Sequence, residues 1–205
     1  MIGQSTIDGS RLTTGNLTMR SPLVLVVLAL VADVSLGQVF GKGKCPTVSV
    51  QQSFDIQKYI GNWYEIQRFY VGFEDNTKCT EANYQLKEDG HIRVDNKCIS
   101  LKDDGKVIEA IGDGYVPDKT QPAKLEVKFA EGAPYGNYWI LDTDNANYTL
   151  IYSCKDVLGL THVEFCWILS RERTLASETK EKLYQKLSGF GVKTDNFLTT
   201  EQTDC

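Results

Sequence analysis

The sequence predicts an all-β protein, an eight-stranded antiparallel up-and-down barrel with one C-terminal α-helix packed on its outside. Two observations support this fold class. Short runs of alternating apolar and polar residues recur between turn signals, and a period of two residues is typical of half-buried strands. A single amphipathic helical pattern follows the last run. Because most connections have hairpin length, we expect a meander that closes on itself and leaves no free edge.

The alternation is clearest in residues 125–129, where three apolar residues are separated by a glutamate and a lysine. Turn pairs such as Asp89-Gly90 and Asp104-Gly105 separate neighbouring runs. The eight expected strands are residues 63–69, 82–86, 91–96, 106–116, 125–129, 138–141, 148–153 and 162–170.

The helix is expected to begin with Ser177 as its N-cap and to end at Gly189. Glu178 suits the positive end of the helix dipole. Leu183 and Leu187 form an apolar stripe one turn apart, which predicts that the helix packs against the outer face of the sheet.

An apolar run over residues 22–32 follows Arg20 and is shorter than the roughly 20 residues that span a bilayer. The small residues Ser35 and Gly37 precede Gln38, an arrangement typical of a signal peptide and its cleavage site. We therefore expect residues 1–37 to be a signal peptide with an N-terminal extension, whether the chain starts at Met1 or Met19. Residues 38–205 would then form one secreted domain. A membrane anchor or a buried core segment is the alternative interpretation of the run.

Composition excludes several classes of function. The formal net charge is -5 and no long run of lysine or arginine occurs, which argues against binding to nucleic acid. The chain has two histidines, His91 and His162, and no Cys-x-x-Cys pair. A metal site is therefore not expected, and neither is histidine-dependent catalysis. We expect a protein that is not an enzyme and requires no cofactor.

Closing eight strands leaves an interior wide enough for one small ligand. The alternation places mostly apolar side chains on the inward faces: Tyr84, Leu86, Ile92, Val94, Leu125, Val127, Phe129, Phe165 and Trp167. Such a lining is typical of a ligand pocket. A barrel filled by its own side chains is the alternative, and the pattern alone does not decide between the two.

Six cysteines in an exported chain indicate disulfides rather than metal ligands. Their spacing leaves the pairing open. They lie at positions 45, 79, 98, 154, 166 and 205.

Three motifs occur in the order and spacing of the lipocalin family. The first contains Gly61 and Trp63, and the second runs from residue 139 to Thr143 and Asp144. The third begins at residue 167 and ends at Arg171. From about residue 44 to residue 205 the chain resembles this family. Residues 44–46, 122–129 and 151–154 resemble its apolipoprotein D members and their insect relatives, the Lazarillo-like and bilin-binding proteins.

The resemblance implies structural roles for the motif residues. Trp63 would plug the closed end of the barrel, and Arg171 would lie across its ring in a cation–π contact. Asn145, which follows the second motif, departs from the aromatic or charged residue usual there.

The resemblance also implies two disulfides, Cys45–Cys154 and Cys79–Cys205. Cys98 and Cys166 fall outside this pattern. Cys166 alternates with Trp167 and should face outward beneath the helix as a buried thiol. A third disulfide or an intermolecular bridge is the alternative for these two residues.

Pocket positions of the family map onto Tyr84, Asn96 and Trp167. The implied ligands are sterols, fatty acids and related lipids, or biliverdin. Because no basic residue lies on the inferred inward faces, a fatty acid should keep its carboxylate near the mouth, and neutral lipids suit the interior better. A lipocalin-fold interaction or inhibitor protein without a ligand is the remaining alternative.

Two apolar loops, residues 69–73 and 157–160, are expected at the open end. They would either contact a membrane or lipoprotein transiently or form a packed lid over the mouth. Asn147 begins a sequon with Thr149 and is the expected glycosylation site of the mature chain.

Overall fold

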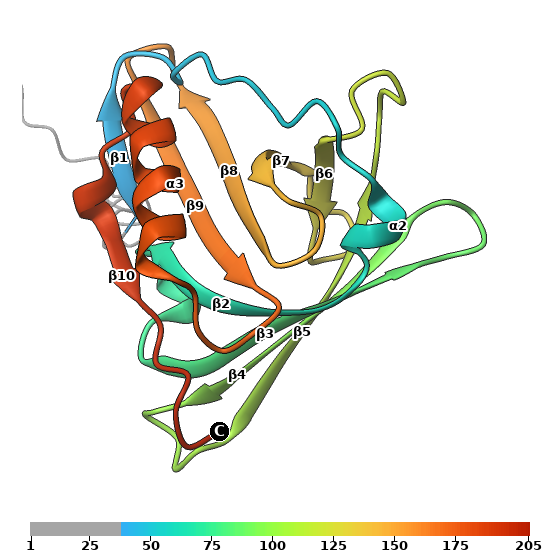
Figure 1. The fold of residues 1–205 in the computed structure, drawn as a ribbon, viewed down its shortest axis with the longest axis vertical. Coiled ribbons are helices and arrows are strands. Elements are labelled where there is room, and N and C mark those ends of the chain that lie inside the picture. Colours follow the sequence, from blue (N-terminus) through green and yellow to red (C-terminus); the bar gives the residue numbers. More distant parts are fainter. Residues whose placement is uncertain (1–37) are drawn as a thin grey trace, which may run out of the picture. The chain divides into compact units, whose positions relative to one another are not determined.

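The computed structural model describes residues 38–205, and the predicted leader over residues 1–37 lies outside the described residues. Eight strands form an antiparallel meander in which the last strand pairs back with the first and closes a barrel (Figure 1). These strands are β2 (Gly61–Phe69), β3 (Thr77–Leu86), β4 (Ile92–Ser100), β5 (Val107–Tyr115), β6 (Lys124–Lys128), β7 (Gly136–Thr143), β8 (Tyr148–Val157) and β9 (Thr161–Ser170). The predicted barrel is confirmed.

Two short strands, which the alternation did not predict, extend the sheet. β1 (Val39–Lys42) pairs with β9, and β10 (Phe197–Thr199) pairs with β2. Both are too short to show a period of two residues. The remaining elements of residues 38–205 are α2 (Ile56–Tyr59), α3 (Ser177–Gly189), η1 (Gly72–Glu74) and η2 (Thr194–Asn196). Among residues 38–205, no helix has the length and apolar character needed to cross a membrane.

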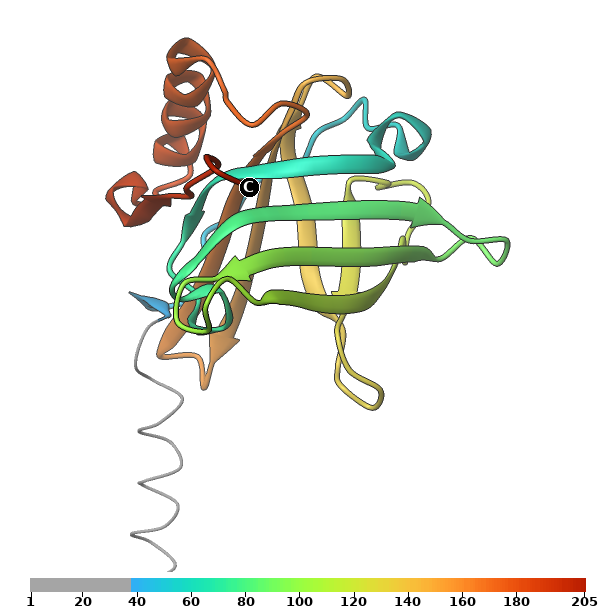
Figure 2. The ribbon, with the colours of Figure 1, turned by 90° about the horizontal axis from the view of Figure 1, so that it is seen from below.

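Helix α3 lies outside the barrel, as predicted (Figure 2). Leu183 and Leu187 are fully buried in a cluster with residues of β2, β7, β8 and β9. The predicted N-cap is wrong by one residue, because Ser177 is the first helical residue and Ala176 is the N-cap. The helix ends at Gly189, as predicted. The turn after the helix uses Gly191, whose φ of 80° lies in the left-handed region that favours glycine.

The closed end of the barrel is sealed by Trp63, whose side chain is fully buried. The Arg171 guanidinium lies 3.8 Å from the centre of the Trp63 ring. It also donates hydrogen bonds to the carbonyl oxygens of Asn62 (2.6 Å), Lys58 (2.7 Å) and Ile60 (2.9 Å). Arg171 therefore satisfies backbone carbonyls where α2 ends and β2 begins, as well as covering the ring.

Gly61 and Asn145 fit this end of the barrel for local reasons. Gly61 has a φ of 97°, which L side chains rarely adopt. Asn145 donates to the carbonyl oxygen of Ser53 (3.0 Å) and accepts from the backbone N–H of Asp55 (3.2 Å). The departure from the family motif at Asn145 therefore joins the turn between β7 and β8 to the segment before α2.

Thr143 and Asp144 hold the same turn. The Thr143 hydroxyl donates to the carbonyl oxygen of Tyr148 (2.6 Å). One Asp144 carboxylate oxygen accepts from the backbone N–H groups of Ala146 (3.0 Å) and Asn147 (2.7 Å). Both motif residues are thus structural, since their side chains satisfy backbone groups.

The two disulfides implied by the resemblance are present, Cys45–Cys154 and Cys79–Cys205. The first joins the segment after β1 to β8, and the second joins the C-terminus to β3. Cys98 and Cys166 are free and buried. Cys166 lies in the cluster beneath α3, as its alternation predicted.

The C-terminal tail fills a gap in the barrel wall. Strands β2 and β3 pair only as far as Tyr64 and Glu81. Beyond that point the backbone N–H of Thr200 donates to the carbonyl oxygen of Ile66 on β2 (3.0 Å). The backbone N–H of Cys79 on β3 donates to the carbonyl oxygen of Glu201, the next tail residue (2.8 Å). Residues 200 and 201 therefore lie between the two strands and bond to both.

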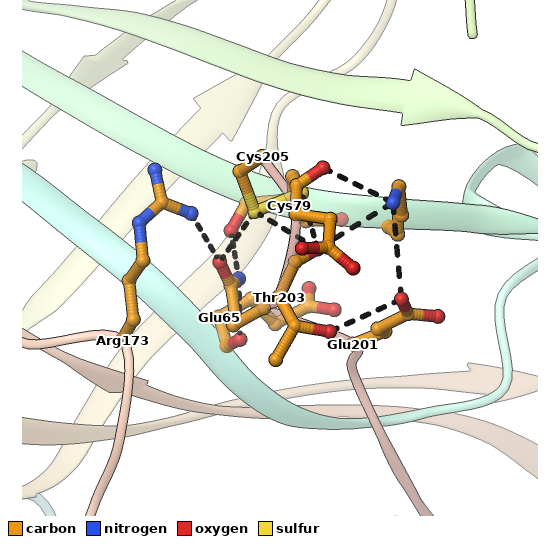
Figure 3. Close-up of a disulfide and its surroundings, with 10 residues drawn as sticks. Glu65, Cys79, Arg173, Glu201, Thr203 and Cys205 are labelled. Carbon is orange, nitrogen blue, oxygen red and sulfur yellow. Dashed lines mark hydrogen bonds and ion pairs between the residues drawn. A yellow bond between two sulfur atoms is a disulfide. The ribbon is translucent and has the colours of Figure 1, made fainter.

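The side chain of Gln202 completes this connection. Its amide nitrogen donates to the carbonyl oxygens of Glu65 (2.9 Å) and Thr80 (2.7 Å), and its amide oxygen accepts from Arg173 (2.8 Å). Figure 3 shows the tail with Arg173 on one side and the Cys79–Cys205 disulfide above it. The disulfide therefore anchors a segment that is part of the wall.

We predict that Arg171→Ala lowers the free energy of unfolding by about 2 to 4 kcal/mol, because it removes a cation–π contact and leaves several backbone carbonyls without their charged donor. Urea denaturation measures the change. Arg173→Ala is the matched control, since Arg173 is exposed and lies 4.4 Å from the Tyr64 ring centre. Arg173→Ala should lower the free energy of unfolding by less than about 1 kcal/mol. Equal losses in both variants would contradict the role given to Arg171.

Candidate ligand cavity

The interior of the barrel is packed at its closed end and hollow toward its mouth. Tyr59 and Trp63 fill the floor. Above them lies an inner chamber of about 100 Å³, and an outer chamber of about 400 Å³ continues to the mouth. The two chambers share Phe73, Glu74, Thr80, Asn96 and Phe129 in their linings. The outer volume alone falls within the roughly 300 to 1,000 Å³ of ordinary ligand pockets.

The structure brings six of the eight predicted ligand-binding residues into these linings: Tyr84, Val94, Asn96, Val127, Phe129 and Trp167. The other two lie outside them. Leu86 is 40% exposed at the end of β3, where the strand extends beyond the barrel floor. Phe165 stacks on Trp167 with ring centres 6.0 Å apart but does not line either chamber. Alternation gives the face of a strand, whereas lining a cavity also depends on depth along the barrel.

Three tyrosine hydroxyls meet at the bottom of the inner chamber. The Tyr138 hydroxyl lies 2.8 Å from that of Tyr59 and 2.6 Å from that of Tyr84. Burial raises the pKa of all three, that of Tyr84 to about 12, so the hydroxyls remain protonated. Three hydroxyl hydrogens serve two hydrogen bonds within the group. The third hydrogen can be donated to the neighbouring Thr149 hydroxyl or, from Tyr84 or Tyr138, which line the chamber, to an acceptor on a ligand. Of the three tyrosines, only Tyr84 was predicted from the sequence to bind a ligand.

Two further polar atoms in the lining have no hydrogen-bond partner among the described residues. They are Oγ1 of Thr80, which is buried, and Oδ1 of Asn96. Both residues line both chambers. Buried polar groups are normally paired, so these two atoms are available to a bound molecule.

An ionisable cluster, which the sequence pattern did not predict, lies beside the same chambers. Arg68 is buried, with its Nε 2.9 Å from Oε2 of Glu74 and 3.8 Å from Oε1 of Glu65. The Trp167 indole N–H donates to Oε2 of Glu74 at 3.5 Å. The hydroxyl of Thr200 in the tail donates to Oε1 of Glu65. Both glutamates line the inner chamber, and Glu74 also lines the outer one.

A β-bulge explains why alternation did not reveal this cluster. The register of β2 against β9 shifts between Glu65 and Gln67. Before the shift, Trp63 and Glu65 face the interior, and after it Arg68 does so. The expectation that no basic residue lies inside the barrel is therefore wrong at Arg68. One extra residue in β2 moves the side chains that follow it to the opposite face of the strand.

The two carboxyls are unusual acids. Burial and, to a smaller extent, the nearby Glu74 carboxylate raise the pKa of Glu65 to about 8, even though Arg68 opposes both effects. Burial also raises the pKa of Glu74, against the lowering effect of Arg68. At neutral pH the Glu65 carboxyl is therefore largely protonated, and one guanidinium is left to balance Glu74.

The two loops expected at the mouth, residues 69–73 and 157–160, differ in how far their apolar side chains are exposed. Phe69 and Val71 are fully buried, whereas Phe73 is 68% exposed and also lines both chambers. Leu158 and Leu160 are 92% and 78% exposed. A packed lid is therefore wrong for residues 158–160, which project from the turn between β8 and β9.

We predict that the free energy of unfolding falls as the pH rises from about 5 to about 8, because folded Glu65 holds a proton that the unfolded chain has already released. In this window the folded state binds more protons, so raising the pH favours unfolding. Glu65→Gln should flatten the dependence when urea denaturation is repeated across the window. Glu131→Gln, an exposed control on the loop after β6, should keep the wild-type slope. Identical slopes in all three proteins would contradict the assignment.

The comparisons agree with this architecture. A family model described as Lipocalin-like domain matches residues 54–202. Apolipoprotein D of Oryctolagus cuniculus is 42% identical over 183 residues, 89% of this chain and 95% of the relative. Bilin-binding protein of Pieris brassicae is 33% identical over 171 residues, 82% of this chain and 88% of the relative.

A solved structure gives the same result. Insecticyanin from the tobacco hornworm Manduca sexta superposes with a TM-score of 0.71 at 28% identity, covering 82% of this chain and 91% of insecticyanin. The sequence motifs, the closed barrel, the floor of Trp63 and Arg171 and these likenesses lead to one conclusion: the chain belongs to the lipocalin family and is similar to apolipoprotein D.

Proposed function

We propose that this lipocalin is an extracellular carrier of a small hydrophobic ligand, a sterol, fatty acid or related lipid held inside the barrel. The observation that carries the proposal is the hollow interior. An outer chamber of about 400 Å³ leads inward from the mouth and is lined by Cys98, Ile108, Ala110 and Phe129 among others. A barrel filled by its own side chains would leave no such space.

The energetics are adequate for a carrier. Burying about a dozen methylene groups at about 0.8 kcal/mol each gives a gross gain near 10 kcal/mol. Association costs reduce this to a dissociation constant around micromolar, which permits both uptake and release.

Several features support export. The sequence has a leader-like segment over residues 1–37, and disulfides such as Cys45–Cys154 persist in oxidising compartments. Asn147 is exposed at a turn and is proposed as a glycosylation site. The exposed Leu158 and Leu160 are proposed to contact a membrane or lipoprotein transiently during ligand transfer.

A linear tetrapyrrole such as biliverdin is the second candidate ligand, favoured by the likeness to a bilin-binding protein. A pure interaction or inhibitor protein is disfavoured by the open cavity. The proposal includes no catalysis. His91 and His162 do not line either chamber. Cys98 lines the outer one, but burial raises the pKa of its thiol and so reduces its thiolate fraction.

The intrinsic fluorescence of tryptophan tests the proposal, because Trp167 lines the inner chamber. Titration with progesterone, arachidonic acid, retinol and biliverdin should quench the emission at micromolar concentration for at least one of them. Trp167→Phe should remove most of the quenching while native mass spectrometry still detects the complex. Trp139 lies outside the barrel core, so Trp139→Phe should leave the quenching by the ligand unchanged. Failure of every ligand to bind would refute the carrier proposal.

Filling the cavity should abolish binding. Ala110→Phe adds bulk to the lining of the outer chamber and is expected to weaken ligand binding by about tenfold or more. Val107→Phe is the matched control, because Val107 is exposed on the same strand and does not line either chamber. Its binding should remain within about twofold of the wild type. Equal effects would place the ligand outside the barrel.

A further inference from the structure

Two carboxyl groups lie near the passage between the inner and outer chambers. Glu74, at the end of η1, lines both chambers, and Glu65 lines the inner one from β2. Among the described residues, Glu74 is the one acidic residue that lines both chambers, so a molecule that occupies both passes beside it. The sequence pattern predicted apolar walls here. On that prediction, only the lack of a cation would disfavour a fatty acid carboxylate inside the barrel.

Within residues 38–205, the groups that face these carboxyls provide no free cation for a ligand. Arg68 on β2 pairs with the Glu74 carboxylate at 2.9 Å and lies 3.8 Å from the Glu65 carboxyl. Glu81 on β3 also borders the inner chamber, and its carboxylate lies near Lys97. Lys97 on β4 lines the outer chamber, but its Nζ pairs with the Glu109 carboxylate at 2.9 Å.

The remaining neighbours do not supply a positive charge either. Cys98 on β4, Trp167 on β9 and Thr200 in the tail are uncharged, and Trp167 and Thr200 already donate to the glutamates. Tyr84 on β3 faces the inner chamber with its hydroxyl bonded to Tyr138. A ligand carboxylate beside Glu74 would meet a like charge in a poorly solvated site, which is unfavourable.

An exchange of partners does not avoid this cost. A ligand carboxylate could take the place of Glu74 beside Arg68, but Glu74 would then be a buried carboxylate without its counter-ion. Such a group binds a proton instead of remaining charged. In both arrangements a fatty acid enters together with a proton, whereas an uncharged lipid does not.

We propose that Glu74 is a specificity-determining residue that makes the cavity select uncharged lipids bearing a hydroxyl or N–H group over lipid carboxylates. The hydroxyl or N–H of the ligand donates to the Glu74 carboxylate. The spare hydroxyl hydrogen of the tyrosine group is available to an acceptor at the other end of the ligand. This inference rests on the proposed carrier function and narrows its ligand class.

The test compares oleyl alcohol with oleic acid, two probes with the same chain and different head groups. The full mature chain is titrated with each by tryptophan fluorescence. At pH about 7.5 the wild type should bind the alcohol at least about tenfold more tightly. As the pH falls from about 7.5 toward 5.5, the affinity for oleic acid should rise by up to about tenfold per pH unit. The affinity for oleyl alcohol should stay nearly constant over the same range. Calorimetry in buffers of different ionisation enthalpy should detect uptake of a proton with the acid alone.

Variants provide the second readout. Glu74→Gln frees Arg68 for a ligand carboxylate, so the affinity for oleic acid should rise by about tenfold or more at pH about 7.5 and lose most of its pH dependence. Glu131→Gln makes the same change in net charge on an exposed loop residue and should behave as wild type. The wild-type pH dependence and proton uptake test the proposal independently if Glu74→Gln fails to fold.

The outcomes separate the two proposals. Tight binding of both probes with equal affinity, no dependence on pH and no proton uptake would overturn the selectivity and leave the carrier function intact. Absence of binding by either probe, and by the ligands tested above, would overturn the carrier function and this inference with it.

Discussion

The contact between Arg171 and Trp63 is the constraint on which the rest of the structure depends. Trp63 lies on β2, the first strand of the barrel, and Arg171 follows β9, the last. Their contact at 3.8 Å fastens the two ends of the meander where β9 pairs back with β2. Because the same guanidinium bonds to carbonyls at Lys58 and Ile60, it also fixes α2 and the floor. A sealed floor is the condition for a cavity that opens at one end only.

The second half of the wall depends on the C-terminal tail. Strands β2 and β3 separate beyond Tyr64 and Glu81, and the tail residues that precede Cys205 bridge the gap. The Cys79–Cys205 disulfide anchors this segment, whose Thr200 hydroxyl bonds to the Glu65 carboxyl. The disulfide thus stabilises more than the chain end, because the segment it anchors also orients a polar group of the cavity.

The cavity changes in character along its axis. Phenolic hydroxyls meet at its bottom, apolar side chains such as Val94 and Val127 form the middle, and the carboxyl of Glu74 faces the passage to the mouth. Exposed apolar residues such as Phe73 and Leu158 surround the opening. Donor groups deep inside and acidic groups nearer the mouth distinguish the two ends of a bound molecule, which a uniformly apolar cavity would not do.

By itself the sequence determined the eight strands, the outer helix and the facing of Tyr84, Val94 and Val127, because these follow from local periodicity and residue type. The closed-end contact of Trp63 with Arg171 followed from the motifs that the sequence shares with the lipocalin family. Tertiary structure alone decided three things. A bulge in β2 turned Arg68 inward, depth along the barrel removed Leu86 and Phe165 from the lining, and the tail entered the wall. Each depends on register or on contacts between segments far apart in the chain, and a period of two residues carries no information about either.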